Sequence, residues 1–288
     1  MPRPVCITYD STCDLTPQLL ERFQIRTVPL TIQSGERVFA DDGQYTSADL
    51  YADYRRNGTL PKTAAVSPEE FKSFFSPILE EGYDIVHIDI SSELSCTCQN
   101  AVLAAQELAE QGRVYVVDSR QLSTGGGLLA LQGAKLRDSG MDAADVAEEL
   151  RGLASCGDTS FVLDTLEYMW KGGRCSGVAA LGANVLKLKP CLEMREGKLV
   201  VCKKYRGAMG KVYRQYITER LAGKTVVEDH AFITHSGEVS EDTLRELTEL
   251  VRELAPFQEV FITQAGCTVS SHCGPGTLGV LFLRQPAQ

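Results

Sequence analysis

A strand, a hydroxyl-rich loop and a helix follow one another in the first half of the chain, and this unit constrains the fold most. Residues 83–90 alternate branched apolar residues with polar ones, which predicts a strand. Residues 101–109 are rich in alanine and leucine and stop before Gly112, which predicts a helix. Residues 91–97 join the two. Unpaired amides at a helix start attract anions, so this loop can bind a carboxylate or phosphate, but serine and threonine also cap helices without a ligand. On this stretch alone, capping is the simpler interpretation.

The alternation of strand and helix runs through the first 155 residues. Residues 5–9, 27–32 and 114–117 have the apolar composition of strands. Helix starts are marked by Thr16, which precedes a proline, and by a capping box that begins at Ser67. Strands that alternate with helices are typical of a mostly parallel sheet covered by helices.

Three stretches lack a clear period. Residues 60–66 predict an irregular segment, and the three glycines at 125–127 predict a close turn before a helix at 128–136. Residues 272–276 predict a tight turn before the last strand. The glycines lack the spacing of a dinucleotide-binding motif or a P-loop, so we interpret them as structural.

The second half has a different pattern. Two short strand-like segments flank residues 196–197 and predict a hairpin. Further strands are predicted at residues 161–164, 231–234, 259–262 and 280–283, and helices at 165–171, 211–221 and 241–254. The sequence therefore predicts an α/β protein of two domains. Residues 1–155 would form a mostly parallel sheet flanked by helices, and residues 156–288 an α/β domain with a mixed or antiparallel sheet.

Charge and hydropathy narrow the function classes. The chain has 29 Lys and Arg against 38 Asp and Glu, a net charge of −9, and no basic cluster dense enough to follow a phosphate backbone. This argues against a nucleic-acid partner. The first residues lead straight into a strand pattern, and no long apolar span occurs. We therefore expect a cytoplasmic protein without stable membrane insertion.

The ten cysteines do not form a metal-binding pattern. Cys6, Cys191 and Cys202 fall inside strand-like segments, where cysteine packs as a small apolar residue. No CxxC pair occurs, and Cys96 and Cys98 are separated by one residue. The sequence also lacks a GxSxG elbow, an HExxH motif and a pair of catalytic carboxylates. We expect free thiols, no metal site, no cofactor and no catalytic residue.

Three isolated basic residues each allow two interpretations. Arg174 lies between two glycines and Ser176, where it can clamp an anion or face water. His272 precedes a Gly-Pro-Gly turn, which would fix its ring, although a lone histidine is more often structural. Arg206 follows other basic residues and either adds positive charge to a site or decorates the surface.

Six segments occur together and in order: Asp10-Ser11-Thr12-Cys13-Asp14-Leu15, Lys62-Thr63-Ala64-Ala65-Val66-Ser67, Ser91-Ser92-Glu93-Leu94-Ser95-Cys96-Thr97, Val116-Val117-Asp118-Ser119, Lys171-Gly172-Gly173-Arg174 and His272-Cys273-Gly274-Pro275-Gly276. Each motif alone is weak, but their joint spacing is specific. In these segments the chain closely resembles the DegV family of bacterial fatty-acid-binding proteins, which includes the acyl carriers of the fatty acid kinase system. The resemblance covers nearly the whole chain.

The resemblance implies a protein that holds one long-chain fatty acid, such as palmitate, in an apolar tunnel, with its carboxylate at the domain junction. It implies that Thr63 and Ser95 bind the carboxylate. It also implies supporting head-group residues, namely Cys96, Thr97, Arg174 and His272. In kinase-linked members the segment of Arg206 contacts the kinase or the acyl phosphate. The resemblance thus implies a carrier that presents the carboxylate to a separate fatty acid kinase and is not itself an enzyme.

This chain departs from the family pattern near the implied ligands. The usual Thr-Ser-Gln-Pro-Ser reads Thr-Ala-Ala-Val-Ser at residues 63–67, which removes polar side chains beside Thr63. Cys96 stands where a glycine is usual, and Cys175 where an isoleucine is common. Thr63 and Ser95 themselves are retained.

Two other function classes remain open at this point. A hydrolase or transferase could use Cys96 or Cys98 as nucleophile, because a helix start lowers the pKa of a thiol. The sequence shows no recognisable His or Asp partner for either cysteine. A protein-interaction module with an incidental lipid is the third hypothesis.

Overall fold

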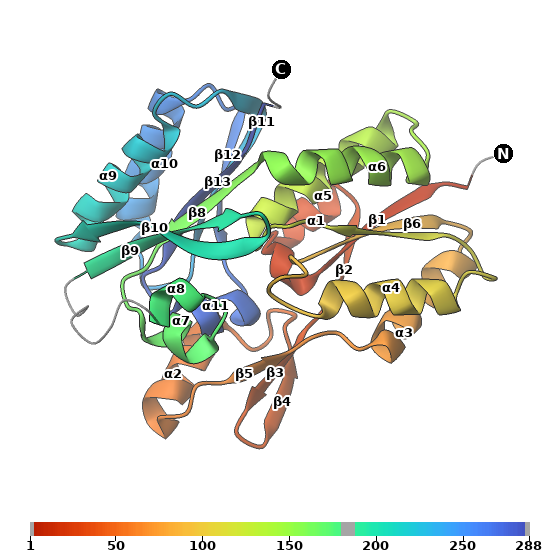
Figure 1. Ribbon diagram of the computed structural model, residues 1–288, viewed down its shortest axis with the longest axis horizontal. Helices are drawn as coiled ribbons and strands as arrows, with labels where there is room; N and C mark the ends of the chain where they lie inside the picture. The colour runs from red at the N-terminus through yellow and green to blue at the C-terminus, as the bar shows by residue number, and fades with distance from the viewer. Residues whose placement is uncertain (1–2, 180–187, 286–288) are drawn as a thin grey trace.

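A four-stranded parallel sheet forms one half of the molecule (Figure 1). The computed structural model describes residues 3–179 and 188–285. The strand order is β2 (Ile25–Val28), β1 (Val5–Asp10), β6 (Asp84–Asp89), β7 (Val114–Asp118), and all neighbours are parallel. Helices cover both faces, as the strand–helix alternation predicts. One face packs against α3 (Pro68–Glu80) and α4 (Thr97–Glu107), and the other against α5 (Thr124–Asp138) and α6 (Ala143–Leu153).

A six-stranded mixed sheet forms the other half. Its order is β10 (Lys198–Arg206), β9 (Leu188–Arg195), β8 (Gly157–Val162), β13 (Leu278–Arg284), β11 (Val226–His235), β12 (Glu259–Gln264). All neighbours are antiparallel except β11 and β12. The outer face packs against α9 (Met209–Leu221) and α10 (Glu241–Leu254). The α/β class with a parallel and a mixed sheet is therefore confirmed, whereas the domain boundary near residue 155 stays a prediction.

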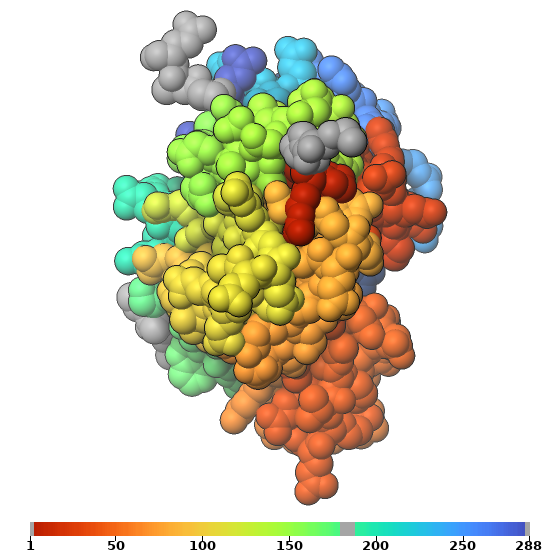
Figure 2. Space-filling view, turned by 90° about the vertical axis from the view of Figure 1, so that its right-hand side faces the viewer, coloured from red at the N-terminus to blue at the C-terminus, as the bar shows by residue number. Residues whose placement is uncertain are grey.

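A small third sheet corrects two expectations. Residues 27–32 do not form one strand, because Pro29 lies between β2 and β3 (Thr31–Ser34), and these strands belong to different sheets. Residues 60–66 are not wholly irregular, since β5 (Lys62–Ala64) pairs with β3, which also pairs with β4 (Arg37–Ala40). The β3–β4 hairpin protrudes from the lower end of the molecule (Figures 1 and 2). Thr63 thus lies on a strand that the sequence pattern does not predict.

The glycine run at 125–127 is part of a helix, which corrects the predicted turn. The glycines form the first turn of α5 after Thr124. A Cβ at Gly125 would lie 1.9 Å from Thr159 Oγ1 of β8, and one at Gly126 would lie 1.8 Å from Tyr9 Oη of β1. No side chain fits at either position. The glycines therefore allow α5 to pack between the two sheets.

The remaining helices are short, apart from α2, and several begin where the sequence predicts. Thr16 and Ser67 cap α1 and α3, and the reciprocal hydrogen bonds of the Ser67 capping box are present. The turn expected at residues 272–276 is shorter than predicted, because His272 and Cys273 end helix α11 and the turn itself is at residues 275–276. The bounds are η1 (Ser11–Cys13), α1 (Pro17–Arg22), α2 (Ser47–Asn57), η2 (Ala154–Cys156), α7 (Glu167–Gly172), α8 (Ser176–Ala179) and α11 (Cys267–Cys273). Within residues 3–179 and 188–285, no helix has both the length and the apolar character that crossing a bilayer requires.

Candidate functional site

A cavity of about 340 Å³ lies where the two large sheets and the small sheet meet. Its volume falls in the range of small-molecule pockets, roughly 300–1,000 Å³. Four segments distant in sequence supply its polar residues: β5, the loop after β6, the loop after α7, and α11. These residues are Thr63, Ser95, Cys96, Arg174, Thr268 and His272. The family resemblance implied six head-group residues, and five of them line this cavity: Thr63, Ser95, Cys96, Arg174 and His272.

Thr63 and His272 are in contact in the lining of the cavity. Thr63 Oγ1 lies 3.2 Å from His272 Nε2. The other ring nitrogen, Nδ1, is buried and has no hydrogen-bond partner among the residues described. It lies against Gly172, where a Cβ would approach it to 2.2 Å. Burial, and secondarily the charge of Arg174, lowers the pKa of His272 to about 4. The ring is therefore neutral at neutral pH.

Ser95 lies in the loop that leads into α4. Its hydroxyl is 2.7 Å from Thr97 Oγ1 and accepts a hydrogen bond of 3.2 Å from the Thr97 amide. Ser95 is half-buried and lines the cavity, whereas Thr97 is fully buried and does not line it. Cys96 occupies the N-cap position and makes no side-chain capping hydrogen bond. The hydroxyl that caps the first amide is therefore Ser95, which also faces the cavity.

Arg174 is the one charged residue that lines the cavity within the described part of the chain. Its side chain is exposed, and Nη1 donates a 2.7 Å hydrogen bond to the carbonyl oxygen of Gly172. No acidic residue lines the same cavity among the residues described. The cavity lining therefore carries a positive charge in a chain whose net charge is −9.

The rest of the cavity is apolar, with a wall made of Leu30, Ala65, Ile90, Leu94, Leu122, Met169, Leu199, Val269 and Cys273. A second, narrow cavity of about 20 Å³ shares Leu122, Val269 and Cys273 with it and leads toward Phe161 and Leu281 of the mixed sheet. These apolar residues could not be singled out from the sequence, because each lies in an ordinary core pattern and only packing places them on one wall.

Two acidic side chains bind the backbone amides at the start of α11. Asp41 accepts hydrogen bonds from the amides of Cys267 (2.9 Å) and Thr268 (3.1 Å), the first residues of α11. Asp14 accepts one from the amide of Gly266 at 2.8 Å. These acids hold α11 in place and so fix the position of His272, but they do not line the cavity.

Two residues considered from the sequence lie elsewhere. Arg206 ends β10, is exposed and does not line the cavity. Cys98 is buried, and burial together with the nearby carboxylates of Asp89 and Asp118 raises its pKa. Cys98 is therefore a thiol rather than a nucleophilic thiolate. In residues 3–179 and 188–285, no group of three or more His, Cys, Asp or Glu residues is placed to hold a metal ion.

A family model described as "Uncharacterised protein, DegV family" matches residues 4–285. The chain belongs to the DegV family. A DegV domain-containing protein of Deinococcus radiodurans is 31% identical over 284 residues, which cover 96% of this chain and 97% of that protein. The family resemblance seen in the sequence motifs is thereby confirmed.

Solved DegV structures share the whole fold. A DegV family protein from Thermus thermophilus, described as binding fatty acid, has a TM-score of 0.87 and 31% identity over 98% of this chain and 99% of that one. A DegV lipid-binding protein from Thermotoga maritima has a TM-score of 0.86 and 27% identity over 100% of both chains. The Fatty Acid Kinase (Fak) B3 protein of Streptococcus pneumoniae, loaded with linoleic acid, has a TM-score of 0.84 at 23% identity over 99% of this chain and 100% of that one, a likeness of fold alone.

Proposed function

We propose that this DegV protein binds one long-chain fatty acid, with the carboxylate at Thr63 and Ser95 and the tail along the apolar wall. The observation that carries the proposal is the composition of the cavity. Hydroxyls, a neutral imidazole and one cation line it together with nine apolar residues, and no acid does so among the residues described. The fatty-acid-binding protein of Thermus thermophilus, 31% identical over nearly the full length, supports the same ligand class.

Tail burial supplies the affinity in this proposal. Each methylene removed from water contributes about 0.8 kcal/mol, so a long acyl chain contributes far more than a head group can. The carboxylate needs hydrogen-bond donors in the cavity, because burying an ionised group without them costs a large amount of free energy. The hydroxyls of Thr63 and Ser95 are neutral donors, and the exposed Arg174 adds positive charge.

His272 acts on the carboxylate through Thr63. Because Nδ1 has no acceptor near it among the described residues, we assign the ring proton to Nε2. Nε2–H then donates to Thr63 Oγ1, and the threonine hydroxyl keeps its own proton for the ligand. His272 is thus a positioning residue for Thr63 in this arrangement.

Denaturing extraction and mass spectrometry of the purified protein test the ligand class. We expect one fatty acid per chain, and its mass gives the chain length. If the protein is empty, a calorimetric titration with palmitate and with oleate should show binding at one site. An empty protein that binds neither acid contradicts the proposal.

The finer role is that of an acyl carrier for a separate kinase. The fold shared with the Streptococcus pneumoniae protein and the exposed position of Arg206, outside the cavity, are compatible with a partner that approaches the rim. The loaded protein, mixed with a fatty acid kinase and ATP, should yield an acyl phosphate that hydroxylamine traps as a hydroxamate. Without added kinase, no hydroxamate should form.

The cysteine-enzyme hypothesis has one point in its favour, since Cys96 and His272 line the same cavity. A histidine whose pKa is about 4 is, however, a weak base at neutral pH. Iodoacetamide labelling distinguishes the two functions. The carrier should show ordinary reactivity at Cys96, whereas an enzyme should show one hyper-reactive thiol that its substrate protects.

A further inference from the structure

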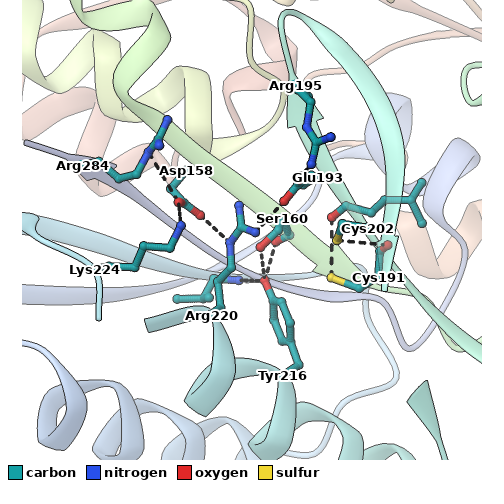
Figure 3. Close-up of polar contacts among 12 residues, drawn as sticks. Asp158, Ser160, Cys191, Glu193, Arg195, Cys202, Tyr216, Arg220, Lys224 and Arg284 are labelled. Atoms are coloured by element: carbon teal, nitrogen blue, oxygen red, sulfur yellow. Dashed lines mark hydrogen bonds and ion pairs between the residues drawn. The ribbon is translucent and has the colours of Figure 1, made fainter. Parts of the chain in front are cut away.

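Cys191 and Cys202 lie side by side on the antiparallel strands β9 and β10 (Figure 3). In this ladder Val201 pairs with Leu192 and Lys203 pairs with Cys191, so Cys202 is the extra residue of a bulge and also opposes Cys191. Cys202 Sγ donates to the carbonyl oxygen of Cys191 at 3.4 Å. This contact brings the two residues close together, as a disulfide requires, since the Cα atoms of a disulfide lie roughly 4.4–6.8 Å apart.

The two thiols differ in their access to solvent. Cys202 is exposed, and Cys191 is buried beneath α9. All ten cysteines fall within the described residues, and only Cys96 and Cys202 among them are exposed. Cys202 therefore combines access to solvent with a second cysteine opposite it, whose backbone its sulfur contacts.

The two thiols also differ in the direction of their pKa shift. The neighbouring Cys191 thiol lowers the pKa of Cys202, and although burial and Glu193 oppose this and Arg220 adds little, the net shift is downward. The Cys202 thiol, followed by burial, raises the pKa of Cys191. Arg220 is held in place by Asp158 at 2.5 Å and Glu193 at 2.6 Å (Figure 3). Since a thiolate rather than a thiol is the nucleophile, the exposed sulfur reacts first.

We propose that Cys191 and Cys202 are a dithiol oxidation site, at which a hydroperoxide converts the pair into an intrachain disulfide. In the first step the Cys202 thiolate attacks one peroxide oxygen. The O–O bond breaks, a sulfenic acid forms, and the other oxygen leaves with a proton as water or an alcohol. In the second step the Cys191 sulfur attacks that of Cys202, the S–O bond breaks, and the hydroxyl leaves as water with the Cys191 proton. Two thiols are oxidised by two electrons in all, and one peroxide is reduced.

The site lies on the face of β9 and β10 that is turned away from the acyl cavity. Cys191 packs with Tyr205 and Tyr216 against α9, while Leu192 and Leu199 belong to the cluster on the cavity side. A disulfide would therefore pin the bulge behind one wall of the cavity without entering it. This inference does not depend on which ligand the cavity binds.

Peptide mapping of the full-length protein tests the proposal. The reduced protein is treated with an equimolar amount of hydrogen peroxide, quenched with N-ethylmaleimide and digested without reductant. Trypsin cleaves after Arg195 and after Lys198, so the two cysteines fall on separate peptides. We expect these two peptides to appear as one linked species that dithiothreitol separates.

Three variants sharpen the result. Cys202→Ser should abolish the link and leave Cys191 reduced, and Cys191→Ser should leave Cys202 as a sulfenic acid that dimedone traps. Cys96→Ser, at the other exposed thiol, should leave the yield of the link unchanged. Circular dichroism checks that each variant is folded. The proposal is overturned if wild-type Cys202 is alkylated after a treatment that oxidises Cys96, or if it is over-oxidised while Cys191 remains a thiol.

Discussion

Two loops follow neighbouring parallel strands at the same edge of the parallel sheet, but they differ in their polar side chains. One is built around buried acids, and the other presents a hydroxyl to the cavity. The loop after β1 contains its own acids. Asp10 accepts hydrogen bonds of 2.8 Å from the amides of Thr12 and Ile90, and Asp14 accepts one from Gly266 at 2.8 Å. The loop after β6 carries Ser95, which faces a cavity that no acid lines within the described residues.

The difference separates buried structural acids from a candidate ligand site. Burial raises the pKa of Asp10 to about 7 and that of Asp14 to about 8, an effect larger than the lowering by their hydrogen bonds, so Asp14 is mostly protonated at neutral pH. The amides at the start of α11 are already bonded to Asp14 and Asp41, so the proposed function assigns the ligand carboxylate to the hydroxyl loop instead. In that proposal the first loop supports the site and the second binds the ligand.

The largest expected effect is on stability. Asp41→Ala removes the acceptor for two backbone amides at α11 and for the Ser11 hydroxyl. Each buried donor left unpaired costs about 1–3 kcal/mol, so we expect a loss of about 3 kcal/mol in the free energy of unfolding, measured by urea denaturation. Asp42→Ala, at the exposed neighbour, is the control. An unchanged urea midpoint for Asp41→Ala would show that these acids do not hold the site together.

The second effect is on affinity. Thr63→Val combined with Ser95→Ala removes both hydroxyls from the cavity, and two hydrogen bonds to a charged group at about 1.5 kcal/mol each correspond to a roughly 100-fold weaker Kd. Calorimetric titration with palmitate measures the change. Ser92→Ala should have no effect, because the Ser92 hydroxyl is bonded to Asp118 outside the cavity. Equal affinity of the double variant and the wild type would remove Thr63 and Ser95 from the head-group site.

The third effect concerns pH. The folded-state pKa of Asp14, about 8, lies above its unfolded value of about 3.9, so the folded protein binds an extra proton between those values. Stability should therefore fall as pH rises from about 4 to about 8, by at most about 1.4 kcal/mol per pH unit for one proton. Asp14→Asn should flatten the slope in urea unfolding at pH 5–8, whereas the exposed Asp145→Asn should not. A wild-type stability that rises steadily over this range would contradict the assignment.

The smallest effect is expected at the rim. Arg174 is exposed, so its attraction for a carboxylate is weakened by solvent and by salt. Arg174→Gln should weaken palmitate binding about threefold at low salt, and less at high salt. Arg206→Gln lies outside the cavity and should leave the Kd unchanged. A loss for Arg206→Gln as large as that for Arg174→Gln would place the carboxylate elsewhere.

Much of the fold could be predicted because local signals agree with it. The capping residues Thr16 and Ser67 each precede a proline, and this local signal starts a helix without help from distant parts of the chain. The missed elements depend on distant partners instead. Thr63 joins a strand only because β3 lies beside it, and α11 contains β-branched and hydroxyl residues with poor helix propensity whose first amides are bound by Asp41.

The sequence motifs singled out Thr63, Ser95, Arg174 and His272, and all four line one cavity, whereas their role in binding stays a prediction. Thr97 does not line it, and Thr268 was not expected. The hydrogen bond between Thr63 and His272 joins residues 209 positions apart, and no local pattern reports it. The apolar wall could likewise not be predicted, because a leucine in the core and a leucine that lines a cavity have the same sequence pattern.

The glycines that begin α5 limit how this protein can be recombined with its relatives. Gly125 and Gly126 fit this helix against Thr159 of one sheet and Tyr9 of the other, and Thr124 hydrogen-bonds to Thr234 at 2.6 Å. In a chimera that takes residues 1–155 from one DegV protein and the remainder from another, α5 comes from the first parent and the mixed sheet that it packs against comes from the second. Exchange of halves should therefore succeed only between parents that match at this contact, and this couples the divergence of the two halves.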